Sequence, residues 1–191
     1  MKKIILTLLL TAISISIISR LPQNTSLAVQ DLDIEQNITE SEVVDKLAEL
    51  KKPTYNIVIV EKEAKALAQM AWGEARGCGD MGMAATMWVV LNRADAWNKS
   101  VFEVVSAPGQ FHGYLPYFPV EDHIYDIAVD VLTRWQMEKQ GASAEEVGRV
   151  LPKDYLYFNG DGQVNWFRIS YEHTGDYWDW SLPNPYETEE N

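Results

Sequence analysis

The chain of 191 residues has one cysteine, three histidines and few basic residues. A single cysteine, Cys78, excludes an intramolecular disulfide, so packing alone must hold the fold together. Lysine and arginine number 16 against 28 aspartates and glutamates, which gives a net charge of −12. A nucleic-acid-binding domain needs a basic surface, so this composition argues against nucleic acid as a partner. The excess of negative charge favours solubility but does not indicate a fold.

Motifs for metal binding and for nucleophilic catalysis are also lacking. His112, His123 and His173 include no closely spaced pair, such as H-x-x-x-H, of the kind that zinc sites use. The chain contains neither the G-x-S-x-G elbow of serine hydrolases nor a phosphate-binding loop. We therefore predict no metal site and no cofactor.

Long hydrophobic runs are absent except at the N-terminus. Lys2 and Lys3 precede an apolar run over residues 4–18, which is shorter than the roughly 20 residues needed to span a bilayer. A basic start followed by a short apolar segment indicates a signal peptide, with cleavage expected after Ala28 in "SLA". Residues 1–28 would then be removed and the protein secreted. If the segment stays uncleaved, it is the only predicted contact with a membrane.

The rest of the chain divides into a polar linker and one main domain. Residues 29–56 are polar and acidic, and they contain a short amphipathic helix in which Thr39 and Glu42 have the spacing of a capping box. The run "YNIVIV" that follows has the length and composition of a strand. Residues 57–187 form the main domain, which is long enough for a real core.

The main domain has a mostly helical pattern. We expect helices over residues 61–76 and 81–94, a short helix from Ser100 to Val105, a long helix with an apolar stripe over residues 124–135, and a final turn or two from Ser143. Asp80 is the expected cap of the second helix, and Asn92 and Arg93 are expected to end it. "YLYFNGDGQVNWFRI" predicts a β-hairpin. The expected fold class is therefore α+β, mostly helical with a small β-hairpin element.

One acidic residue lies where the helical pattern predicts an apolar one. Leu67, Ala71 and Glu74 recur at steps of four and three, which places Glu74 on the face expected to be buried. A helical glutamate is by default a solvated surface residue. Burial favours the protonated form of a carboxyl group, which is the form that a general acid needs. The pattern therefore marks Glu74 as a candidate catalytic acid.

Three motifs around this residue point to a known family. "GEARG", an apolar helix that ends in "LNR", and "APGQF" follow one another at residues 73–77, 91–93 and 107–111. In this order and spacing they resemble the spore-cortex-lytic (SleB-like) cell-wall hydrolase family, over roughly residues 64–177. The resemblance implies a lysozyme-like domain that acts on the glycan strands of peptidoglycan, in the cell wall or the spore cortex, with Glu74 as the catalytic acid.

The reaction implied by the resemblance is that of a lytic transglycosylase, which needs one carboxylate and gives 1,6-anhydromuramyl products. Two alternatives stay open. One is a hydrolytic muramidase that uses water, with Asp80 or another acid assisting. The other is a non-catalytic wall-binding or sporulation scaffold, because Cys78 replaces the second glutamate of the family's "GEARGE" pattern.

Candidate contacts to the substrate follow from residue type and position. Amides suit sugar hydroxyl groups, aromatic faces suit sugar rings, and alternate residues of a strand share a face, so Tyr155 and Tyr157 are expected to point the same way. The predicted substrate-binding residues are Gln110, Tyr155, Tyr157, Asn159 and His173. No wall-anchoring repeat is recognisable, so residues 29–54 or a targeting protein would direct the enzyme to the wall.

Overall fold

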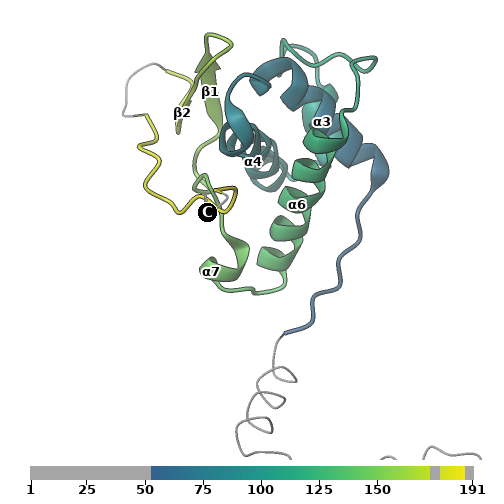
Figure 1. Ribbon diagram of the computed structural model, residues 1–191, viewed down its shortest axis with the longest axis vertical. Helices are drawn as coiled ribbons and strands as arrows, with labels where there is room; N and C mark the ends of the chain where they lie inside the picture. Colours follow the sequence, from purple (N-terminus) through teal and green to yellow (C-terminus); the bar gives the residue numbers. More distant parts are fainter. Residues whose placement is uncertain (1–52, 173–176, 188–191) are drawn as a thin grey trace, which may run out of the picture. The chain divides into compact units, whose positions relative to one another are not determined.

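The elements surround one buried central helix. In this computed structural model, which describes residues 53–172 and 177–187, the elements are α3 (Glu61–Ala75), α4 (Gly79–Trp97), α5 (Val101–Ser106), α6 (Asp122–Lys139), α7 (Ala144–Val147), β1 (Tyr157–Gly160) and β2 (Asn165–Arg168) (Figure 1). The described residues belong to one compact unit. The prediction of a mostly helical α+β domain with a small hairpin is confirmed. The predicted signal peptide and the helix after Thr39 lie outside the described residues.

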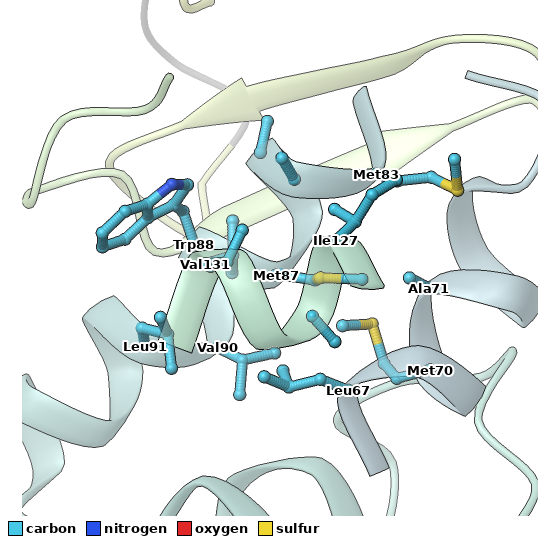
Figure 2. Packing of buried hydrophobic residues seen from close by; sticks show 14 of the residues in the cluster. Leu67, Met70, Ala71, Met83, Met87, Trp88, Val90, Leu91, Ile127 and Val131 are labelled. Atoms are coloured by element: carbon cyan, nitrogen blue, oxygen red, sulfur yellow. The ribbon is translucent and has the colours of Figure 1, made fainter. Parts of the chain in front are cut away.

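The core is built around α4, which is apolar on almost every side. Every residue of α4 from Gly82 to Ala94 is buried, and the helix packs against α3, α5, α6 and β1. Figure 2 shows the centre of this packing, where labelled side chains of α3, α4 and α6 meet. Burying each large apolar side chain contributes about 1.5–3 kcal/mol, so this core is the main source of stability. None of the helices within residues 53–172 and 177–187 is long and apolar enough to span a membrane.

Two short helices begin as the sequence predicts. The Ser100 side chain accepts from the N–H of Glu103, whose carboxylate in turn accepts from the N–H of Ser100. Ser143 and Glu146 form the same reciprocal pair at the start of α7. Both capping boxes satisfy N–H groups that a helix end leaves without partners, and the two predicted helices are confirmed.

The predicted ends of α4 are wrong. The helix begins at Gly79 with Cys78 at the N-cap position, and Asp80 lies in its first turn, where it binds His123 instead of capping the helix. At the other end the helix runs on to Trp97, and the backbone turns at Asn98 with a φ of 51°. Asparagine tolerates this left-handed conformation better than most residues, so the helix stops there and not at Asn92 and Arg93.

The predicted strand at residues 55–60 is also wrong. This segment is extended, but no neighbouring strand pairs with it within the described part of the chain. The side-chain amide of Gln136 on α6 instead accepts from the N–H of Val58 at 2.9 Å and donates to its carbonyl at 2.8 Å. Gln140 does the same for Asn56, at 2.9 and 3.1 Å. Two glutamines of a helix thus replace the backbone ladder that a strand would need.

The hairpin is antiparallel, with Tyr157 paired to Arg168 and Asn159 paired to Trp166. Its turn uses Asp161, whose carboxylate accepts from the N–H groups of Gln163 and Val164, both at 2.9 Å. Gly162 at the turn has a φ of 91°, which glycine adopts without strain. The alternate residues Asn165 and Phe167 are buried, so one face of the hairpin packs on the helices. The predicted hairpin is confirmed.

Candidate functional site

Glu74 lies in the last turn of α3, one residue before the helix ends. Ala71 and Ala75 beside it are buried, whereas Glu74 itself is half-buried, so the predicted burial of this residue is only partial and its carboxylate lies at the border of the core. The Oε1 atom of Glu74 accepts a hydrogen bond from the backbone N–H of Gly113 at 2.5 Å. One carboxylate oxygen is therefore held by the main chain of a loop that comes 39 residues later in the sequence.

Two glycines allow this loop to come so close to the helix. A Cβ atom on Gly73 would overlap the carbonyl oxygen of Gly113, and a Cβ atom on Gly113 would lie 2.6 Å from the carbonyl carbon of Gly73. Only residues without a side chain fit at both positions. Gln69, one turn earlier on α3, fixes the next part of the loop by donating to the carbonyls of Pro116 and Phe118, each at 2.9 Å.

The hairpin is fastened to the same end of α3 by Asn165. Its Nδ2 atom donates to the backbone carbonyl of Glu74 at 3.2 Å and to Oγ1 of Thr86 on α4 at 3.1 Å. Asn165 is 3% exposed, so these bonds lie in the interior. Sequence reasoning missed this residue. The sequence could have indicated it, because Asn165 is two residues from the apolar Phe167 and so lies on the same, buried face of β2.

A buried cation, Arg93, lies within electrostatic range of Glu74. Arg93 of α4 is 5% exposed and donates from Nε to the carbonyl of Leu156 at 2.7 Å. Its guanidinium carbon lies 4.9 Å from the ring centre of Phe111 and 5.4 Å from that of Tyr157. Burial lowers the pKa of Arg93 to about 10, while Tyr157 and Glu74 favour its charged form. The side chain therefore stays cationic at neutral pH.

The structure gathers two of the predicted substrate residues around this cation. Gln110 is exposed in the loop, and its Oε1 atom accepts from Nη1 of Arg93 at 3.3 Å. Tyr157 is the first residue of β1, and the Arg93 guanidinium lies over its ring. The same ring lies 5.9 Å from that of Tyr171 in an edge-to-face contact. Asn159, two residues further on, shares the strand face of Tyr157.

The other two predicted substrate residues are not placed there. Tyr155 comes before β1, so the prediction that it shares a strand face with Tyr157 is wrong. Its ring packs edge-to-face on Trp178 at 5.4 Å, and its carbonyl accepts from Nδ2 of Asn92. A turn that starts at Pro152, in which the N–H of Tyr155 donates to the carbonyl of Pro152, keeps Tyr155 out of the strand. His173 lies outside the described residues.

Three polar residues near Glu74 in sequence are engaged elsewhere. The carboxylate of Asp80 bonds Nε2 of His123 on α6 at 2.8 Å. Arg76 donates to the carbonyl of Trp72 and lies over its ring. Burial raises the pKa of the Cys78 thiol, with Asp161 adding to the shift, so this cysteine is not an activated thiolate. Within the described residues, no three His, Cys, Asp or Glu side chains form a cluster that could hold a metal ion.

Comparison with protein-family models, with curated proteins and with solved structures finds no match to this chain.

Proposed function

We propose that the chain cleaves the glycan strands of peptidoglycan as a lytic transglycosylase, through a lysozyme-like domain in which Glu74 is the general acid and base. The observation that carries the proposal is the hydrogen bond between Gly113 and Oε1 of Glu74. It holds the carboxyl group of Glu74 at a helix end, at the border of the core, between a loop and a hairpin. A general acid must be fixed in this way to reach a leaving oxygen.

The two oxygens of Glu74 can then have different roles. Oε1 accepts from the main chain, which leaves Oε2 to carry the proton. In the first step this proton passes to the glycosidic oxygen as its bond to C1 breaks. The resulting carboxylate takes the proton of the C6 hydroxyl group of the same muramic sugar, and O6 bonds to C1. A 1,6-anhydro ring forms, Glu74 is protonated again, and no water is consumed.

The charge of Arg93 suits this cycle. Glu74 is negatively charged between the two proton transfers, and a nearby cation in a partly buried site stabilises that state. Because Arg93 is bound to the carbonyl of Leu156 and to Gln110, its position is fixed before the substrate arrives. Gln110 and Tyr157 lie around the guanidinium and would contact the sugars.

A hydrolytic muramidase is the second candidate, and it would differ in using water and a second carboxylate. Ordinary glycosidases place a second carboxylate about 5–10 Å from the acid. Asp80 or another acid would take this role, and the Asp80 carboxylate is bound to His123. This contact favours the mechanism in which the substrate supplies the nucleophile. Secretion to the cell wall or spore cortex, and a targeting protein, remain part of the proposal.

The decisive test is mass spectrometry of peptidoglycan digested by the protein without residues 1–28. The test compares it with Glu74→Gln and with Glu63→Gln, a matched change at another half-buried position of α3. We expect anhydro-muropeptides from the unmodified protein and from Glu63→Gln, and none from Glu74→Gln. Glutamine keeps an oxygen that can accept from Gly113, so Glu74→Gln should retain the melting temperature.

The other outcomes each identify a different function. Reducing-end muropeptides would mean that water is the nucleophile and would replace the transglycosylase by a muramidase. No release from several wall types by any of the three proteins would leave the non-catalytic scaffold. A marked drop in melting temperature for Glu74→Gln alone would make Glu74 a structural residue.

A further inference from the structure

A groove of about 420 Å³ runs along the N-terminal half of α3. One wall is α3 itself, and the others come from α5 and from the loop that holds Glu74. The residues that give the groove its chemistry are Glu61, Lys62, Lys65, Gln69, Phe102 and Tyr114. No sequence motif pointed to these residues, and the function proposed above does not use them.

The groove combines aromatic walls with two cations. The ammonium group of Lys62 lies 3.3 Å from the centre of the Phe102 ring, and Tyr114 lines the groove as well. Lys65 forms an ion pair with Glu61 at 2.5 Å. Two lysines against one glutamate leave the lining with a net positive charge, on a chain whose net charge is −12. Such a lining suits an anionic ligand with some apolar surface.

The groove is physically connected to the site of Glu74. Tyr114 lines the groove, and its neighbour Gly113 donates to the Glu74 carboxylate. Gln69, also in the lining, holds the loop through the carbonyls of Pro116 and Phe118. Gln69 and Glu74 are five residues apart on one helix, or about 7–8 Å along its axis. The loop that carries Gly113 and Tyr114 therefore borders both the groove and the site of Glu74.

We propose that this groove binds a short acidic peptide through its carboxylates, and that this peptide is the stem peptide attached to the glycan strand. The identity of the peptide rests on the proposed function; the class of ligand rests on the lining alone. Lys62, which has no carboxylate partner among the described residues' ion pairs, is the first contact. Lys65 becomes the second when the ligand displaces Glu61.

The test is an NMR titration of the protein without residues 1–28 with the synthetic tripeptide Ala-γ-D-Glu-diaminopimelate. We expect shifts confined to the amides of residues 61–69, 102 and 114. The double variant Lys62→Gln/Lys65→Gln should weaken binding by about tenfold or more. Glu61→Gln should tighten it, because it frees Lys65. The tripeptide with its carboxylates amidated should not bind.

The matched control is Lys99→Gln/Lys153→Gln, which removes the same charge from two exposed lysines outside the groove. It should bind the tripeptide like the unmodified protein. Equal weakening in both double variants would show unspecific attraction and overturn the proposal. No binding at millimolar tripeptide, or shifts elsewhere on the protein, would do the same.

This experiment separates the groove from the glycan chemistry. The tripeptide has no glycosidic bond, so Glu74→Gln should bind it unchanged. Tripeptide binding without glycan cleavage would refute the proposed function and keep the groove as an acidic-peptide site. Glycan cleavage without tripeptide binding would refute the groove proposal alone.

Discussion

Asn165 donates to the backbone carbonyl of Glu74 across 91 residues of sequence. The last carbonyls of a helix have no partner within the helix, and here one of them is bound by a strand. The same amide reaches Thr86 on α4. One buried side chain therefore joins the hairpin, α3 and α4 at the position of the candidate acid, and the geometry of the site depends on it.

Asn165→Ala should destabilise the protein by about 1–3 kcal/mol, because it leaves the Glu74 carbonyl and Thr86 with one partner fewer in the interior. Urea unfolding followed by circular dichroism measures this change. Asn56→Ala, at an exposed position where only the backbone is bonded, should stay within about 0.5 kcal/mol of the unmodified protein. Equal stability of the two variants would mean that the Asn165 amide is not a structural link.

Gly113→Ala should reduce glycan cleavage by about 100-fold, the scale of loss expected when a catalytic group is displaced by about 1 Å. The added Cβ would lie 3.0 Å from Cδ of Glu74 and closer still to the backbone of Gly73, so the loop must move away from the acid. The rate of muropeptide release measures the effect. His112→Ala changes the neighbouring exposed residue and should keep its rate; a similar loss there would point to general disturbance of the loop.

Glu138 should make the stability of the protein depend on acid pH. Burial acts to raise the pKa of Glu138, but the hydrogen bonds and charges of Arg149 and Lys153 outweigh burial and lower it. A carboxyl group with a lowered folded pKa stabilises the fold above its unfolded pKa, and this contribution disappears as the pH falls through the folded pKa.

Glu138→Gln should therefore cost about 1–3 kcal/mol at pH 7, where it breaks a two-bond contact with Arg149. The difference between variant and unmodified protein should shrink as the pH is lowered through the folded pKa of Glu138, which lies below the usual value for a glutamate. Urea unfolding across this range measures it. Glu145→Gln, at an exposed position of α7, should show no such trend. A difference for Glu138→Gln that stays constant with pH would show that the charge of Glu138 is not what stabilises the fold.

Gln136→Ala should release the segment before α3 without unfolding the core. The Val58 N–H and carbonyl both lose their partner, and they are exposed enough to bond water instead. Hydrogen exchange at the Val58 amide should become about tenfold faster or more, as expected for an opening that costs about 1.4 kcal/mol less. Gln163→Ala in the hairpin turn should leave that amide unchanged. Unaltered exchange in Gln136→Ala would mean that other contacts hold the segment.

Local signals in the sequence predicted the helices and the hairpin well. Ser100 and Ser143 cap their helices through residues three positions away, and Asp161 forms its turn within three residues. Such contacts join residues that are close together in the sequence, so a local pattern is enough to predict them. The fold class follows from them together with the apolar pattern of α4.

Contacts between distant residues were not predictable in this way. The extended segment at residues 55–60 has the composition of a strand, and only the position of Gln136 and Gln140 on α6 decides that it pairs with side chains. Arg93 was expected at a helix end, with internal pairing as an option; the helix continues to Trp97, and the guanidinium is buried and bonded to the carbonyl of Leu156. Both outcomes depend on tertiary neighbours that the local pattern does not contain.

The contact between Gly73 and Gly113 has a consequence for protein engineering. Main chain meets main chain there, so the close approach of Gly113 to Gly73 requires that neither position carries a side chain. The residues of the loop beyond Gly113 can then be exchanged to recognise other ligands while the hydrogen bond to Glu74 keeps its length. The chain thus offers a scaffold in which binding preference and the position of the carboxyl group can be changed separately.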